Sequence, residues 1–186
     1  MQSEKRAAMT PYERVLKRLE GRPVDRVPNL NIIMTFAAKW IGVPYSRYVR
    51  DYRCLVEGNL ACCEKFGIDM VSAISDPYRE TSGFGAHVIF PEDDVPKCTD
   101  FFIKQYSDLK ELSVHKPLEC ERMLDRIRAV ELYKSQAGRT YPILGWVEGA
   151  FAEANDLRGM TEIMMDLYDE PGFIKELLEI CNEQAI

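Results

Sequence analysis

The chain has 186 residues, of which 46% are hydrophobic and 29% are charged, and its formal net charge is −6 at pH 7. This composition is typical of a globular protein with a hydrophobic core, and the acidic balance argues against nucleic acids and anionic membranes as partners. The sequence contains no apolar run long enough to span a bilayer and no signal-peptide core, so we expect a single cytoplasmic domain over residues 1–186.

Helical segments dominate the first third of the chain. Thr10 precedes Pro11 and is followed three residues later by Glu13, a pattern typical of a capped helix start. Gly21 and Gly67 follow apolar residues at roughly helical spacing and predict helix ends. The elements expected here are a helix over 10–20, a strand over 30–34, a helix over 36–41, a helical turn over 46–50 and a helix over 51–66.

A buried strand with an acidic residue at its end is the central feature of the predicted fold. Residues 68–74 are almost continuously apolar, which is typical of a parallel strand covered on both faces. Asp76 follows this strand, and ligands of α/β proteins bind at the carboxyl ends of such strands. Asp76 is therefore a candidate catalytic residue, although an aspartate in this position also commonly caps the next turn.

The rest of the chain continues the alternation of strands and helices, and a small β-hairpin interrupts it once. Residues 77–86 are predicted to form a long loop that leads into a small hairpin. The elements expected after this loop are strands over 87–90 and 101–106, a helical turn over 107–112, a helix over 119–137, a buried strand over 141–147, and helices over 150–157, 161–168 and 171–182, the last of them capped by Asp169.

This order of elements predicts an α/β protein built from parallel βαβ units. The core strands are too few to close a barrel, and a (β/α)₈ barrel typically takes about 250 residues. The sequence is therefore interpreted as the N-terminal half of a larger α/β domain, with a small hairpin insertion.

Several segments together resemble the uroporphyrinogen decarboxylase superfamily, particularly its corrinoid-dependent methyltransferase branch. They follow the family's order over nearly the whole chain, but they correspond only to the family's N-terminal half. The matching segments are residues 12–16, 21–28, 66–71, 90–93, 145–159 and 165–171. The resemblance implies a (β/α)₈ TIM barrel whose active site lies at the carboxyl ends of the strands.

The resemblance to the decarboxylases has one clear departure. In those enzymes an aspartate in this region holds the pyrrole nitrogens of the tetrapyrrole, and Asp76 resembles that residue. They also carry an arginine-rich segment after the first strand, which grips the carboxylates of the substrate. The corresponding residues 31–39 contain no arginine, so uroporphyrinogen decarboxylation is the alternative rather than the preferred function.

The methyltransferase branch resembles this sequence better. Its members move a methyl group from a methylated corrinoid, carried by a partner protein, to a thiol such as coenzyme M or to tetrahydrofolate. In the thiol-methylating members a zinc ion bound by His-x-Cys and a later Cys activates the acceptor as a thiolate. The resemblance implies zinc for a full-length member, but neither His87 nor His115 has a cysteine two residues later, so no metal ligand is assigned in this chain.

Four further residues are candidates for substrate binding. Arg79 can bind an anionic acceptor through its planar guanidinium, but it can equally well form an ion pair within the protein. Tyr78 can line a pocket for a macrocycle, but it can also simply pack in the core. Glu148 follows the predicted strand over 141–147, and Glu153 lies one helical turn further on, so both are placed at the same edge as Asp76.

A different class of function also stays open. Half of a parallel sheet has an unpaired edge strand and uncovered apolar faces, which favour association. The chain is therefore also interpreted as an inactive fragment or as a remnant that forms homo-oligomers.

Overall fold

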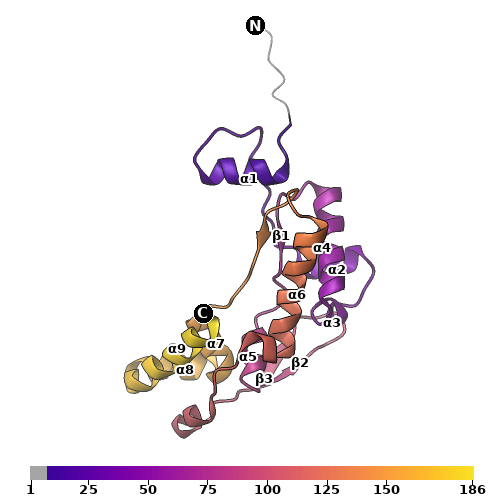
Figure 1. The fold of residues 1–186 in the computed structure, drawn as a ribbon. Coiled ribbons are helices and arrows are strands. Elements are labelled where there is room, and N and C mark those ends of the chain that lie inside the picture. Colours follow the sequence, from indigo (N-terminus) through magenta and orange to yellow (C-terminus); the bar gives the residue numbers. More distant parts are fainter. Residues whose placement is uncertain (1–7) are drawn as a thin grey trace.

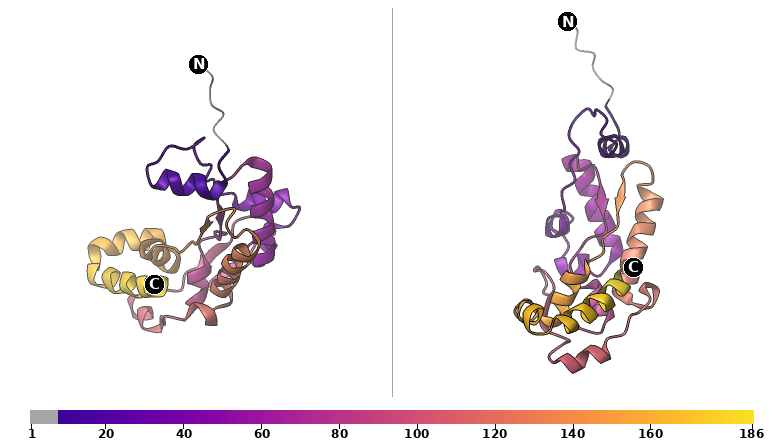
Figure 2. Two further views of the ribbon diagram at one scale, coloured as in Figure 1. Left: turned by 45° about the horizontal axis from the view of Figure 1, so that its top comes forward. Right: turned by 90° about the vertical axis from the view of Figure 1, so that its left-hand side faces the viewer.

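The computed structural model describes residues 8–186. Figure 1 shows α1 at one end of the molecule, a central group of helices that includes α4 and α6, and the helices α7 to α9 at the opposite end. The extended segment that contains β4 connects the central group to α7, and the views in Figure 2 show the same separation.

Nine α-helices and two 3₁₀-helices make up most of the described chain. The α-helices are α1 (Pro11–Leu19), α2 (Met34–Trp40), α3 (Tyr45–Tyr48), α4 (Tyr52–Phe66), α5 (Arg79–Gly83), α6 (Glu121–Gln136), α7 (Ala150–Arg158), α8 (Met160–Asp169) and α9 (Pro171–Ala185). The 3₁₀-helices are η1 (Tyr106–Glu111) and η2 (Pro117–Glu119).

The helices whose ends were read from local signals are confirmed. The Thr10 hydroxyl accepts a hydrogen bond from the amide of Glu13, and the Glu13 carboxylate accepts one from the amide of Thr10, which completes the capping box of α1. Asp51 caps α4 through the amide of Arg53, and Gly67 ends that helix in the left-handed region with φ = 62°. The expected cap of α9 is wrong: Glu170, not Asp169, precedes Pro171 as the cap residue, and its side chain makes no capping bond.

The core sheet is short and parallel. Strand β1 (Val71–Ser72) pairs with β4 (Ile143–Leu144), with Val71 opposite Ile143. Both predicted strands are thus confirmed in place and direction, but they are much shorter than the apolar runs that predicted them. The strand expected over 30–34 is wrong, because residues 30–33 have no regular structure and Met34 begins α2.

The hairpin is confirmed, with a corrected second strand. Strand β2 (His87–Ile89) pairs in antiparallel fashion with β3 (Lys97–Asp100) rather than with residues 101–106. The apolar residue Ile103 is instead buried in the second core cluster, and its amide donates to the carbonyl of Leu157. The loop expected over 77–86 is also corrected, because α5 forms within it.

Two separate clusters of buried side chains hold the fold together. The first cluster joins α2, α3, α4, β1 and α6 and includes Tyr48, Leu55 and Tyr133. The second cluster joins the end of α5, η1 and the helices α7 to α9 and includes Leu157, Ile163 and Leu177. These clusters correspond to the two groups of helices that Figure 1 shows at either end of the β4 segment.

A network of charged side chains holds the amino-terminal end of β1. Asp69 is fully buried, and its carboxylate accepts hydrogen bonds from Arg14 on α1 (2.6 Å), from both terminal nitrogens of Arg26 (2.5 and 2.8 Å) and from the amide of Asn29 (2.8 Å). Arg14 also pairs with Asp25 at 2.6 Å. The network therefore ties α1 and the segment after it to the start of the central strand.

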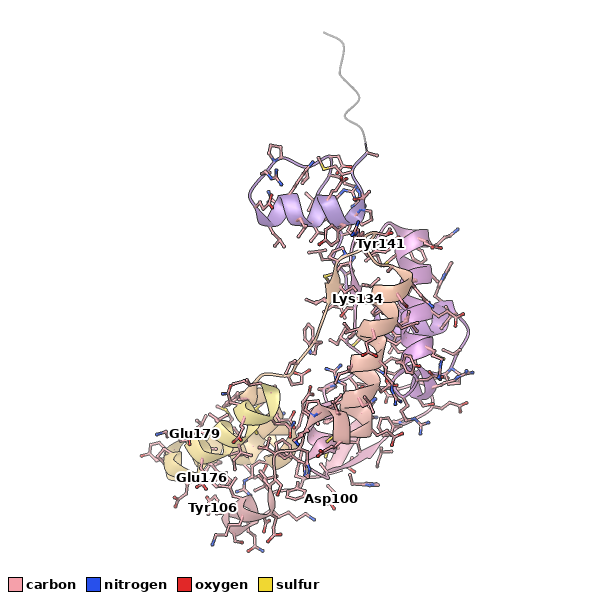
Figure 3. All side chains as sticks on the ribbon, in the orientation of Figure 1. Asp100, Tyr106, Lys134, Tyr141, Glu176 and Glu179 are labelled. Carbon is pink, nitrogen blue, oxygen red and sulfur yellow. The ribbon has the colours of Figure 1, made fainter. Side chains whose placement is uncertain are left out.

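The two ends of the sheet are distinguished by the labelled side chains in Figure 3. Tyr141, which precedes β4, and Lys134 on α6 lie towards α1. Asp100, the last residue of the hairpin, and Tyr106, which follows it in η1, lie at the opposite end near α9, where Glu176 and Glu179 are labelled. The carboxyl ends of β1 and β4 therefore face the α7–α9 end of the molecule.

The junction between α7 and α8 depends on a glycine. Gly159 has φ = 95°, and a Cβ added there would lie 2.8 Å from Glu162 Oε2 and 3.0 Å from the ring of Phe101. We expect Gly159→Ala to lower the free energy of unfolding by about 1–3 kcal/mol, because alanine does not adopt this backbone conformation without strain.

Urea unfolding followed by circular dichroism measures this effect. The matched control is Gly172→Ala in the first turn of α9, where an added Cβ would contact nothing within 4 Å. This control should be neutral or slightly stabilising. Equal stability of the Gly159→Ala variant and the parent would contradict the role of Gly159.

None of the helices in residues 8–186 has the length and apolar character that crossing a membrane requires.

Candidate functional site

Polar residues gather where β1 and β4 end. The segment after β1 supplies Asp76 and leads into α5, which carries Arg79 and Glu80. The segment after β4 supplies Glu148 and leads into α7, which carries Glu153. In parallel sheets the carboxyl ends of strands meet at one edge, and ligands of α/β proteins bind there.

Asp76 is held in place by three hydrogen bonds. Its side chain is fully buried, and its Oδ2 accepts from Arg122 Nη2 on α6 at 2.5 Å and from the Ser75 hydroxyl at 2.6 Å. Its Oδ1 accepts from the amide of Tyr78 at 3.1 Å. Burial alone would raise the pKa of the Asp76 carboxyl, but Arg122 and Ser75 outweigh burial and hold this pKa below its ordinary value.

The sequence allowed two interpretations of Asp76, and the structure bears directly on one of them. The bond from the amide of Tyr78 is the turn-capping contact of a strand-end aspartate. The ion pair with Arg122 also fixes a carboxylate at the edge where ligands bind. A catalytic role for Asp76 stays a prediction, and we expect any substitution there to change the stability of the fold, because the buried carboxylate holds three hydrogen bonds.

Arg79 spans the two strand ends. Its guanidinium is buried and donates to the carbonyl oxygens of Ala73, after β1 (3.0 Å), and Trp146, after β4 (3.2 Å). Its Nε has no hydrogen-bond partner within residues 8–186 and lies 4.0 Å from the Glu80 carboxylate. Burial lowers the pKa of this guanidinium, and Glu80 opposes that shift. Arg79 thus holds the two strand ends together, and its binding of a substrate stays a prediction.

Tyr78 and Glu148 border the same region. Tyr78 is partly buried, and burial together with the charge of Asp156 raises the pKa of its phenol. Glu148 is partly buried and accepts a hydrogen bond from the Trp146 indole at 2.8 Å. That bond orients the Trp146 ring beside the strand end.

Glu153 and Asp156 are the most perturbed carboxyl groups of the region. Glu153 is 2% exposed, and neither of its carboxyl oxygens has a hydrogen-bond partner within residues 8–186. Burial is the main cause that raises the pKa of Glu153 to about 8. The nearby charges of Glu80, Asp156 and Glu148 contribute to this rise, and Thr81 opposes it. Burial and Glu148 raise the pKa of Asp156 to about 7. Near neutral pH the site therefore holds protonated carboxyl groups.

Sequence reasoning missed Glu80, Asp156 and Arg122. Asp156 lies three residues after Glu153 and therefore on the same face of α7, so the helical spacing alone would have indicated it. Glu80 was missed because α5 was expected to be a loop. Arg122 follows Asp76 by 46 residues, and no local pattern links the two.

The residues 8–186 contain no group of three or more His, Cys, Asp or Glu side chains that could hold a metal ion. The zinc site that the resemblance implies for a full-length member therefore does not fit the side chains in this part of the chain.

Comparisons with known proteins agree with these observations. Residues 10–186 match the family model described as uroporphyrinogen decarboxylase (URO-D). A solved structure of a methyltransferase from Methanosarcina mazei superposes with a TM-score of 0.82 at 21% sequence identity. The alignment covers 95% of this chain and 53% of that protein, so this chain spans about half of its length. No curated protein matches the sequence.

The likeness to the methyltransferase concerns the fold, and the family match covers nearly all of the chain. The family has the TIM-barrel fold, and the helices and short parallel sheet found here are consistent with part of such a barrel. The resemblance seen in the sequence is thereby confirmed: the chain belongs to the uroporphyrinogen decarboxylase family.

Proposed function

We propose that the chain forms the N-terminal half of a (β/α)₈ barrel that transfers a methyl group from a methylated corrinoid protein to a thiol or to tetrahydrofolate. The observation that carries this proposal is the acidic character of the region where β1 and β4 end. Four carboxyl groups gather there: Glu80, Glu148, Glu153 and Asp156. Burial, together with the charges of other members of this group, raises the pKa values of Glu80, Glu153 and Asp156.

The same acidic character disfavours the decarboxylase alternative. A tetrapyrrole rich in carboxylates needs cationic side chains at the mouth of its site, because protonated, neutral carboxyl groups cannot offset its charge. The arginines nearest to the strand ends are already engaged. Arg79 donates to two backbone carbonyls, and Arg122 pairs with Asp76 and donates to the carbonyl of Val49.

The side chains of this chain have binding and orienting roles in the proposed reaction. The corrinoid of the partner protein supplies the methyl group. A protonated Glu153 can donate a hydrogen bond to a polar atom of the ligand, and Asp76, fixed by Arg122, can accept one from an N–H group. Trp146, oriented by Glu148, gives the site an apolar wall.

Binding of a free corrinoid tests the proposal, and the fluorescence of Trp146, which lies in the site, can report it. The sequence contains two tryptophans, Trp40 on α2 and Trp146 after β4. In a Trp40→Phe variant the fluorescence reports Trp146 alone. We expect methylcobalamin to quench this emission and to bind about tenfold more tightly than uroporphyrin, a difference of about 1.4 kcal/mol.

The matched control is the Trp146→Phe variant, which keeps Trp40 and should show no saturable quenching. A methyltransferase assay with methylcobalamin and coenzyme M follows the transfer itself. Preferential binding of uroporphyrin, or decarboxylation of uroporphyrinogen, would favour the alternative function. Binding of neither macrocycle would contradict both and would favour an inactive fragment.

A further inference from the structure

A second candidate site lies outside the strand ends, between α4 and α6. A cleft of about 1030 Å³ opens there, and its lining comes from the start of α4, the segment from α5 to β2, and the start of α6. Clefts of this size hold small organic ligands. The cleft is built entirely from residues 50–128 and is separate from the carboxyl groups of α7.

Guanidinium groups line this cleft from two sides. Arg50 and Arg53 lie at the start of α4, and Arg122 and Arg128 lie on α6. Within residues 8–186, Arg50 and Arg128 make no ion pair, and Arg50 uses only its Nε to donate to the carbonyl of Ser46. The buried Nε of Arg122 has no hydrogen-bond partner there either. These arginines therefore keep N–H donors available for a ligand.

Most carboxylates of the cleft, in contrast, already have partners. Asp51 caps α4 through the amide of Arg53, and Asp125 accepts from the amide of Tyr52 and from Arg126. Glu119 lies 3.8 Å from Lys116. Glu121 is the exception, since it is exposed and makes no ion pair within residues 8–186. The unused hydrogen-bonding capacity of the lining thus consists mainly of donors.

Phe90 fixes two of these arginines in the cleft wall. The guanidinium carbon of Arg50 lies 5.2 Å from the centre of the Phe90 ring, and that of Arg122 lies 5.1 Å from it. Such cation–π contacts hold the guanidinium planes without using their N–H groups in the plane. In addition, no side chain caps the N-terminus of α6, so its first backbone N–H groups add to the positive potential.

We propose that this cleft binds a small molecule through a phosphate or polyphosphate group, with Arg50 and Arg128 as the main ligands to the anion. Arginine suits this role because its planar fork of N–H groups matches the oxygens of a phosphate. The proposal does not rest on methyl transfer, because its main ligands Arg50 and Arg128 lie apart from the strand ends; only Arg122, which pairs with Asp76, belongs to both places.

Isothermal titration of the whole chain with inorganic pyrophosphate tests the proposal. We expect saturable binding that weakens as the salt concentration rises, and we expect the double variant Arg50→Gln, Arg128→Gln to bind at least about tenfold more weakly. The variant Glu121→Gln should bind more tightly than the parent, because it removes an exposed carboxylate from the lining of the cleft.

The matched control is the double variant Arg18→Gln, Arg139→Gln, which removes the same charge from exposed positions outside the cleft. It should bind pyrophosphate as the parent does. The circular dichroism spectrum of each variant shows whether it is folded. Absence of binding to the folded parent at millimolar pyrophosphate would overturn the proposal, and so would equal weakening in the control and the cleft variant.

Discussion

Replacing Asp69 by alanine should lower the free energy of unfolding by about 3–5 kcal/mol. The Asp69 carboxylate is buried and accepts hydrogen bonds from Arg14, from Arg26 and from the amide of Asn29. The side chain of Arg14 is only 6% exposed, and removal of the Asp69 carboxylate leaves it with Asp25 as its only counter-charge. Removing one partner of a buried ion pair costs more than the pair itself contributes, because the remaining charge stays desolvated.

Urea unfolding monitored by circular dichroism measures this loss. The matched control removes the acidic partner of an exposed pair: Glu20→Ala, where the side chains of Arg22 and Glu20 are 58% and 53% exposed. Exposed pairs contribute about 0–1 kcal/mol, so the control should unfold almost as the parent does. A similar small effect of both substitutions would show that the network does not anchor α1 to β1.

Raising the pH from about 5 to about 8 should destabilise the parent protein, and Glu153→Gln should remove much of this dependence. The pKa of Glu153 is raised from 4.5 to about 8 in the folded state, and that of Asp156 from 3.8 to about 7. Between the unfolded and folded pKa values, the folded protein binds protons that the unfolded chain has lost. Stability contributed by each group is therefore complete below its unfolded pKa and is lost as the pH rises through its folded pKa.

One carboxyl changes the free energy of unfolding by at most about 1.4 kcal/mol per pH unit. Glutamine has nearly the shape of a protonated glutamate and does not ionise, so the Glu153→Gln variant should exceed the parent in stability near pH 8 and match it near pH 4. Urea unfolding across this range checks the result. The control Glu64→Gln changes an exposed residue on α4 and should leave the pH dependence unchanged. A parent whose stability rises over the same range would contradict the buried, protonated state of Glu153.

Local chemistry made part of the fold predictable from the sequence. The capping box of α1, the Asp51 cap of α4 and the turn at Gly67 involve residues within a few positions of one another, so short patterns indicate them. The predictions were wrong where one apolar pattern fits both a β-strand and a buried segment without regular structure. Residues 101–106 contain an apolar run that fits a strand, but Ile103 instead fills a cluster formed with α7 and α9.

The site was predictable only at the level of single residues. Asp76, Glu148 and Glu153 were expected together because they follow parallel strands, which end at a common edge, and the structure places them at that edge. Their charge states depend on contacts that sequence spacing does not reveal. Arg122 comes from another helix to neutralise Asp76, whereas Glu153 is buried with no partner within residues 8–186.

The buried carboxyl groups lie at the boundary between the two hydrophobic clusters. Glu80 on α5 and Glu153 on α7 lie where the helices of the first cluster meet those of the second, and Arg79 bridges the ends of β1 and β4 at the same junction. Proteins open locally in cooperative units, and these units differ in the free energy that opening costs. Loss of the proton from Glu153 adds repulsion at this boundary. We therefore expect alkaline pH to weaken the packing of α7 to α9 against the rest of the protein. These three helices should separate as a unit, while the helices around α4 and α6 keep their packing.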